Sequence, residues 1–118
     1  MEDKQENNKI KFEDFLKIDI RIGEVLECEK VEGTDKLLKL KVDFGEEIGI
    51  KQILTAMAQF YEPKDFIGKQ MPFIVNLEER KIRGEISQGM VMAGDIGEDE
   101  KPVFLNPDSK INNGTKVL

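Results

Sequence analysis

The chain has 118 residues, of which 24 are acidic and 18 basic, so its formal net charge is −6. This is the length of one domain, and it suffices for a core without stabilising disulfides. The chain has no histidine and a single cysteine, Cys28, which excludes Ser-His-Asp and Cys-His catalysis, histidine-ligated metals and an internal disulfide. Its longest uncharged stretch, Gln52 to Tyr61, has ten residues, against about 20 for a membrane helix. We therefore expect no membrane association, no metal and no cofactor.

The negative charge is concentrated in two short segments. Residues 1–8 carry a net charge of −2 and residues 95–100 a net charge of −4, which together account for the whole −6. The remaining, neutral part of the chain contains two groups of basic residues. These are Lys36, Lys39 and Lys41 in the first group, and Arg80, Lys81 and Arg83 in the second. Because surface potential follows local charge, either group can form a basic face; the alternative is that both are ordinary solvated charges.

Hydrophobic periodicity predicts a chain built mainly of strands. Residues 1–10 are polar and aperiodic, which predicts a flexible leader before a domain at residues 11–118. In chain order, the pattern then predicts a helix at 11–17, strands at 18–26, 38–44 and 48–54, helical turns at 54–61 and 63–66, strands at 70–77 and 87–93, and a short strand at 102–105. We expect turns at 33–35 and 45–47, and Gly23 predicts a bend or bulge in the first strand.

Five main strands with a short helix between the third and the fourth are the layout of an OB-fold. The predicted fold class is therefore all-β, a five-stranded Greek-key barrel with an added N-terminal helix and a C-terminal extension. Small barrels of this kind commonly bind oligonucleotides or oligosaccharides, but a fold alone does not establish a function.

The segment 76–90 carries the most chemical information. It connects two predicted strands and offers three cations, the Asn76 amide and the Ser87 hydroxyl. Cations engage phosphates, while amides and hydroxyls can contact base edges or ribose. Its glycines allow close approach of the backbone to a ligand. The alternative interpretation is a charged hairpin whose glycines only satisfy the geometry of turns.

Several stretches of the chain, in order and at matching spacing, resemble one known family. They are residues 12–15, 19–23, 31–37, 61–63, 67–69, 75–77, 80–84 and 87–90. From Phe12 to Leu118 the chain resembles the tRNA-binding domain of methionyl-tRNA synthetases, found as a C-terminal or beta-subunit domain. It also resembles the free-standing dimeric tRNA-binding proteins and the CsaA-type secretion chaperones.

The resemblance implies an OB-fold that dimerises through its C-terminal segment and binds the outside of folded tRNA, in the cytoplasm and without catalysis. It also implies a methionyl-tRNA synthetase catalytic chain as a possible partner. Matched position by position, the tRNA-binding residues would be Lys36, Asn76, Arg80, Lys81, Arg83, Ser87 and Met90.

Three residues in or near this set have structural alternatives. Met90 lies at an alternating strand position, where methionine is more often a core residue, and we expect it in the core. Lys36 is also compatible with a simple turn. Arg21, between two isoleucines of the first strand, is compatible with a structural ion pair.

Departures from the tRNA-binding pattern leave the chaperone function open. Thr55-Ala56 stands where that branch typically has Ser-Gly, and Glu79 stands where many members have proline. Residues 46–52 and the ending from Asn106 to Lys116 look more like the CsaA-type chaperones.

A peptide-binding chaperone needs an exposed apolar groove. Five apolar residues of this chain are candidates to line such a groove. They are Met57, Phe60, Tyr61, Met71 and Phe73. The alternative, which we favour, is that they fill the core and a dimer interface. We expect Cys28 to be a small core residue, and Val103 to Leu105 to cover either this barrel or a partner's.

Overall fold

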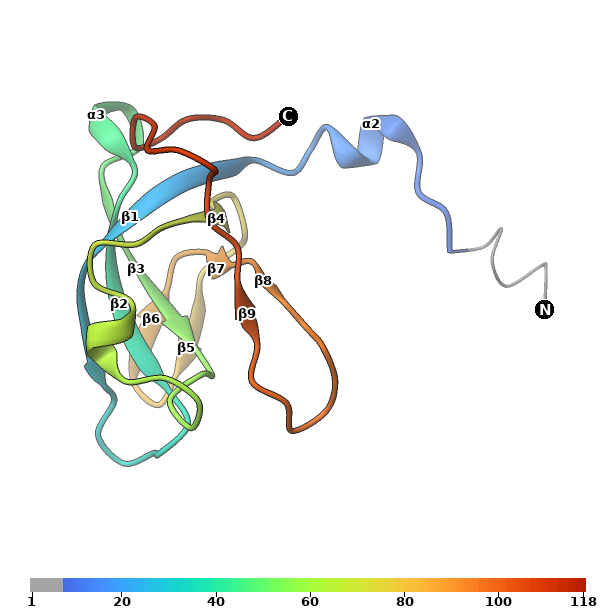
Figure 1. Cartoon of the computed structure of the whole chain (residues 1–118). Helices are drawn as coiled ribbons and strands as arrows, with labels where there is room; N and C mark the ends of the chain where they lie inside the picture. The colour runs from blue at the N-terminus through green and yellow to red at the C-terminus, as the bar shows by residue number, and fades with distance from the viewer. Residues whose placement is uncertain (1–7) are drawn as a thin grey trace.

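The computed structural model describes residues 8–118, so most of the predicted leader lies outside the described residues. The described chain begins with a short helix, α2 (Phe12–Phe15), which extends away from the rest of the molecule (Figure 1). It is shorter than the helix predicted at 11–17. In the described part of the chain, no helix combines the length and the apolar character needed to cross a lipid bilayer.

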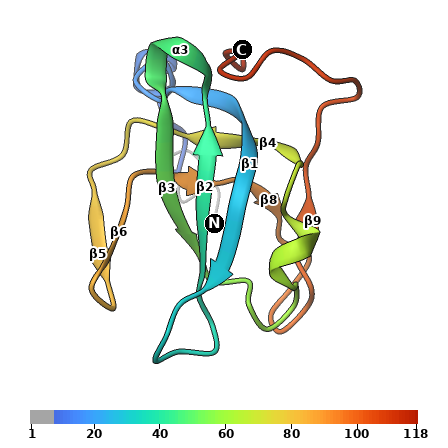
Figure 2. The same ribbon diagram turned by 90° about the vertical axis from the view of Figure 1, so that its left-hand side faces the viewer.

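The body of the molecule is a strongly curved sheet of five strands in the order β3-β2-β1-β4-β7, with all neighbours antiparallel (Figures 1 and 2). These strands are β1 (Ile20–Lys30), β2 (Leu38–Asp43), β3 (Ile50–Thr55), β4 (Gln70–Ile74) and β7 (Met90–Val91). The sheet curls into a nearly closed barrel, and the predicted all-β, OB-like fold is confirmed.

The long strand β1 belongs to both halves of the barrel. Its first part pairs with β4 and its second part with β2, and the change of partner occurs at Glu24. A bend or a bulge is predicted at Gly23; the bulge is wrong in position, because the register shift lies between Val25 and Glu27. Gly23 has a different role: a Cβ atom there would lie 2.5 Å from the Phe44 ring and 2.5 Å from Val42. Its missing side chain lets the core pack directly against the bent strand.

The core is filled by alternate residues of the strands and by one aromatic side chain from the β3–β4 connection. Val42 and its neighbours at alternate β2 positions are fully buried, as are Phe44 and Phe73, whose rings meet edge to face at 5.3 Å. Phe66 follows the 3-10 helix η1 (Pro63–Asp65), and its side chain is fully buried in the core.

Two predicted local elements differ in the structure. The turn predicted at 45–47 is instead a short helix, α3 (Gly45–Ile48). The helical stretch predicted at 54–61 is only a hydrogen-bonded turn, in which the Phe60 and Tyr61 amides donate to the Met57 carbonyl.

The predicted fifth strand, residues 87–93, is divided into three short pieces. They are the end of β6 (Glu85–Ser87), β7, and β8 (Ala93–Gly94). The first break includes Gly89, where an added Cβ atom would lie 2.6 Å from the Ile74 carbonyl oxygen, and the second is Met92. Just before Gly89, the Gln88 amide donates to the Gln52 carbonyl at 2.8 Å, which brings this segment back to β3. The ring of strands closes there.

The C-terminal extension covers the chain's own barrel. β9 (Val103–Phe104) pairs with β8, and the Phe104 ring stacks on Tyr61 with centroids 4.2 Å apart. Farther on, residues 114–117 run beside the start of β1, with the Ile22 amide donating to the Thr115 carbonyl at 2.9 Å. Gln70 anchors the segment before them: its side chain donates to the Ile111 carbonyl at 2.6 Å and accepts from the Ile111 amide at 3.2 Å.

Gly23→Ala should destabilise the protein by about 1–3 kcal/mol, because the new methyl group overpacks the core against Phe44 and Val42. Urea denaturation measures the change. Gly94→Ala is the matched control, since its Cβ would meet Val103 at an ordinary 3.5 Å. Equal stability of the two variants would contradict this account of Gly23.

Gln70→Leu should cost about 1–3 kcal/mol, because both backbone groups of Ile111 lose a buried partner. Amide hydrogen exchange should also accelerate in residues 111–117, while β2 stays protected. Exchange that is unchanged in residues 111–117 would show that Gln70 does not anchor the C-terminal extension.

Candidate nucleic-acid interface

The connection from β4 to β7 forms a charged hairpin that projects from the barrel (Figure 2). Its strands β5 (Arg80–Ile82) and β6 (Glu85–Ser87) are antiparallel and joined by the two residues Arg83 and Gly84. Their φ angles are 55° and 81°, and two positive values are the requirement of a type I′ hairpin turn. Glycine therefore does satisfy turn geometry here. We call residues 80–87 the basic hairpin.

Arg80, Lys81 and Arg83 are all exposed on the basic hairpin. Among residues 8–118, none of the three lies within ion-pair distance of a carboxylate. Arg80 and Lys81 are adjacent on one strand and point to opposite sides of it, while Arg83 occupies the tip. The hairpin thus presents three uncompensated charges in different directions.

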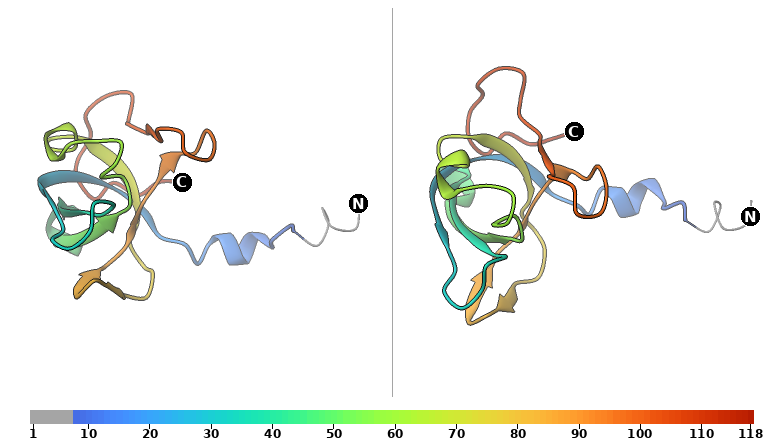
Figure 3. Two further views of the ribbon diagram at one scale, coloured as in Figure 1. Left: turned by 90° about the horizontal axis from the view of Figure 1, so that it is seen from below. Right: turned by 60° about the horizontal axis from the view of Figure 1, so that its bottom comes forward.

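The loop that carries Lys36, residues 31–37 between β1 and β2, points to the same end of the barrel as the tip of the basic hairpin (Figures 2 and 3). Lys36 is exposed, and its backbone is held by Thr34 Oγ1 and by the Ala58 amide. In OB barrels, the loops after the first strand and after the fourth strand are those that contact oligonucleotides. The two predicted basic groups therefore contribute to one end of the molecule.

The other two lysines of the first basic group have partners. Lys39 lies between Glu29 and Glu85, with Nζ 3.1 and 3.3 Å from their carboxylate oxygens. Hydrogen bonds to Glu29 and then to Glu85 raise the pKa of the Lys39 amine. The Lys41 ammonium donates to Gln52 Oε1 at 3.0 Å. The charge of Lys39 is thus compensated by two carboxylates on other strands. Lys36, in contrast, has no carboxylate within ion-pair distance in the described chain.

Two predicted site residues use their side chains to hold backbone segments together, Ser87 at the base of the basic hairpin and Asn76 just after the end of β4. Ser87 is buried, and its hydroxyl accepts from the Leu54 amide and donates to the Gly89 carbonyl, both at 3.0 Å. Asn76 is exposed, but its amide accepts from the Asp19 amide at 2.9 Å and donates to the Lys17 carbonyl at 2.6 Å. One N–H and one lone pair of Asn76 remain available to a ligand.

The core placement expected for Met90 is wrong. Its side chain is 55% exposed, because the neighbouring Val91 takes the inward position of β7 and Met90 points outward. The structural alternative for Arg21 is confirmed: Nε lies 2.7 Å from Asp19, and a terminal nitrogen lies 3.2 Å from Glu47. The hydrogen bond to Asp19 is the largest of the effects that raise the pKa of Arg21.

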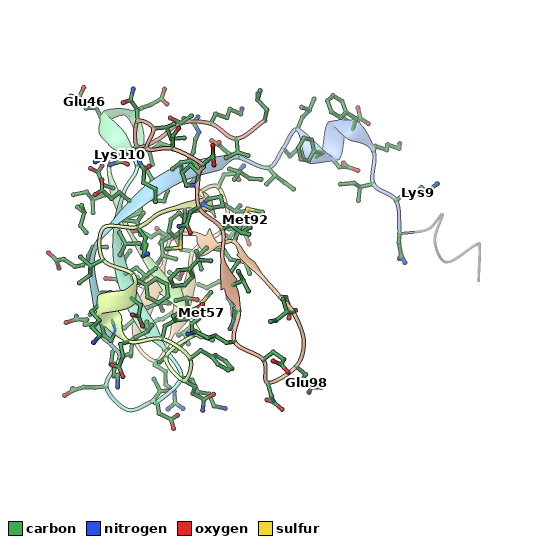
Figure 4. All side chains as sticks on the ribbon, in the orientation of Figure 1. Lys9, Glu46, Met57, Met92, Glu98 and Lys110 are labelled. Atoms are coloured by element: carbon green, nitrogen blue, oxygen red, sulfur yellow. The ribbon has the colours of Figure 1, made fainter. Side chains whose placement is uncertain are left out.

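The apolar residues considered for a peptide groove mostly fill the barrel. Met57, Met71 and Phe73 are buried, and Figure 4 places Met57 among the side chains of the interior. Phe60 and Tyr61 are half-buried, and Phe104 covers Tyr61. These five residues therefore do not line an exposed apolar groove.

Cys28 is half-buried. Burial raises the pKa of its thiol to about 12, so this cysteine is protonated and unreactive at neutral pH.

The acidic segment lies away from the basic hairpin. Glu98 is at the tip of the β8–β9 loop (Figure 4), and this loop and the basic hairpin lie on opposite sides of the barrel (Figures 2 and 3). Four of the negative charges are carried by residues 95–100. The tips of both point toward the same end of the barrel, and they are separated across its width (Figure 2). Because exposed charges are screened beyond about 10 Å at 0.1 M salt, a net negative chain can still present a basic side.

Sequence reasoning did not single out Gln52 and Glu85. Gln52 lies on β3 and makes five hydrogen bonds at 2.8–3.3 Å: two through its backbone to Gln88, and three through its side chain to Lys41, Glu85 and the Ile86 carbonyl. The only signal in the sequence is a polar residue at an outward position of a strand. Such a residue is indistinguishable from an ordinary solvated one until the hairpin is placed beside it.

Residues 20–116 match the family model described as "Putative tRNA binding domain". The methionine–tRNA ligase of Clostridium tetani is 40% identical over 109 residues, which are 92% of this chain and 17% of that protein. Among solved structures, the chaperone CsaA from Bacillus anthracis is 35% identical, with a TM-score of 0.82 over 93% of this chain and 99% of that one. A MetRS-related protein from Pyrococcus horikoshii is 32% identical, with a TM-score of 0.86 over 94% and 99% of the two chains.

The chain therefore spans about one sixth of the length of the curated ligases it matches, and nearly all of the two solved chains. The family model covers most of the barrel, the basic hairpin and the C-terminal extension. By this match and by its fold, the chain belongs to the tRNA-binding domain family.

Proposed function

We propose that this chain is a non-catalytic module that binds folded tRNA with the end of the barrel formed by the basic hairpin and the β1–β2 loop. The observation that carries the proposal is the set of three exposed cations, Arg80, Lys81 and Arg83, without carboxylate partners in the described chain. Membership of the family supports tRNA as the ligand.

The proposed contacts are mainly to the RNA backbone. Lys36 and the three hairpin cations suit phosphates, and binding of this kind weakens as salt rises. Met90 offers an exposed apolar surface for a ribose or base, and Asn76 retains one donor and one acceptor. Ser87 does not contact the RNA in this proposal; its hydroxyl holds the base of the hairpin against β3. Recognition follows the shape of the RNA more than its sequence.

We further propose that the chain works as a symmetric dimer in the cytoplasm, alone or with a methionyl-tRNA synthetase catalytic chain. The C-terminal segment is the proposed interface, since Val103 and Leu105 remain 48% and 42% exposed after Phe104 has packed on the barrel. The α2 helix adds further apolar surface, with Phe12 72% exposed. A two-fold axis would present two basic hairpins to RNA.

The second candidate function is binding of unfolded polypeptides. The likeness to the chaperone CsaA from Bacillus anthracis favours it, and so does the apolar surface left exposed at α2. The burial of Met57, Met71 and Phe73 argues against it, because these residues offer no groove.

Replacing the hairpin cations as Arg80→Ala, Lys81→Ala and Arg83→Asn should abolish most tRNA binding. Asn is used at position 83 because it tolerates the positive φ of that residue. Titration of labelled bulk tRNA between about 50 and 200 mM salt measures the effect. The slope of log K against log salt should fall by about one for each phosphate that no longer meets a cation, about three in total.

The matched control removes three exposed lysines that belong neither to the basic hairpin nor to the β1–β2 loop, Lys64, Lys69 and Lys110, each to Ala. It carries the same change in charge and should keep most of the affinity. Equal loss of affinity in both variants would place the binding surface elsewhere. No tRNA binding by the unmodified chain at low salt, together with capture of an unfolded polypeptide, would favour the chaperone function.

Light scattering at micromolar concentration should give twice the mass of one chain. Val103→Asp combined with Leu105→Asp should shift the protein to one chain's mass, because charges in the proposed interface are costly to bury. A monomeric mass for the unmodified chain would refute the dimer.

A further inference from the structure

The basic hairpin is held against the barrel by a small network of polar side chains. Gln52 Nε2 donates to the Ile86 carbonyl at 2.9 Å and to Glu85 Oε1 at 3.3 Å. The other Glu85 oxygen lies 3.3 Å from Lys39 Nζ. These interactions join β2 and β3 to β6, and we call Gln52, Glu85 and Lys39 the hairpin tether.

We propose that Gln52 and Glu85 are positioning residues for RNA binding, which fix the direction in which the basic hairpin presents its cations. This inference rests on the proposed function and goes beyond it, because it assigns a supporting role to an acidic residue at the centre of the basic surface. A hairpin of two three-residue strands has little stability by itself, so its orientation depends on such contacts.

The tether is more than one exposed ion pair, which by itself would contribute little. The Lys39 side chain is 21% exposed and that of Glu85 is 33% exposed, so both are partly withdrawn from water. The Gln52 amide uses both of its N–H groups on the hairpin, and Lys41 donates to its oxygen. Its backbone is bonded to Gln88 in both directions, which fixes the point from which the side chain extends.

Charge alone and positioning predict opposite results for the same substitution. Glu85→Ala removes a negative charge close to Arg83 in sequence and releases Lys39 from one of its two carboxylates. If the surface acted only as a sum of charges, tRNA would bind more tightly. If the tether directs the hairpin, tRNA binds more weakly because the hairpin must be ordered on binding.

The decisive experiment measures tRNA affinity for two pairs of variants. Glu85→Ala is paired with Glu78→Ala, which removes the same charge from an exposed residue of the same connection. Gln52→Met is paired with Gln59→Met, a neutral change at an exposed glutamine outside the tether. We expect about three- to tenfold weaker binding for the first member of each pair. We expect unchanged or tighter binding for the second member.

Two further readouts separate positioning from direct contact and from unfolding. The salt dependence of binding should stay as in the unmodified chain, because no phosphate ligand is removed. Amide hydrogen exchange in residues 80–87 should accelerate in the tether variants, while that of the buried strand β2 stays slow. Glu85→Gln keeps one acceptor oxygen, which can serve Gln52 or Lys39 but not both, because the carboxylate uses a different oxygen for each. Its binding should therefore lie between that of Glu85→Ala and that of the unmodified chain.

The positioning role would be overturned if Glu85→Ala and Gln52→Met bound tRNA as tightly as their control variants do. A reduced salt slope would overturn it as well, because it would make the altered residue part of the phosphate-binding surface. If the unmodified chain does not bind tRNA at all, the proposed function fails and the positioning role fails with it.

Discussion

The rest of the structure depends on how the barrel is closed. β7 pairs with β4 through only two residues, so the backbone ladder by itself seals little of the last gap. Closure is completed by three hydrogen bonds to β3. The Ser87 hydroxyl accepts from the Leu54 amide, the Gln88 side chain accepts from the Gln52 amide, and the Gln88 backbone amide donates to the Gln52 carbonyl. An unpaired strand edge costs folding free energy when it is buried, and it can pair with another chain when it is exposed. The same closure fixes the base of the basic hairpin, because Ser87 is the last residue of β6.

This arrangement separates the charges of an acidic protein. The acidic residues 95–100 lie in the β8–β9 loop, and the cations of the basic hairpin lie on the other side of the barrel (Figure 2). Two other cations approach carboxylates that lie on different elements: Arg21 reaches Glu47, and Lys39 reaches Glu29 and Glu85. Arg80, Lys81 and Arg83 are among the cations that have no carboxylate partner in the described chain, and they remain available to phosphates.

Much of the fold could be read from local patterns, because those patterns reflect burial. Leu38, Leu40 and Val42 alternate with polar residues, and all three are fully buried. The helix between the third and fourth strands was predicted from Pro63, and it is present as η1. The prediction for Met90 was wrong because alternation fixes which residues share a face but not which face is inside. Val91, its neighbour, takes the interior position. Of the bend or bulge predicted at Gly23, the bulge lies instead after Val25, because a glycine accommodates a close neighbour as readily as a bulge.

The sequence by itself determined the strand order along the chain, the family and the grouping of Arg80, Lys81 and Arg83 on one connection, because these are local or contiguous features. Only the tertiary structure decided which basic residues stay free. Lys39 looks equivalent to Lys36 in the sequence, yet it meets Glu29 and Glu85, which are ten residues before it and 46 residues after it. Gln52 likewise becomes a junction only when the hairpin lies beside β3. The charge and hydrogen-bonding state of a side chain depends on neighbours brought together by folding, and spacing along the chain does not specify those neighbours.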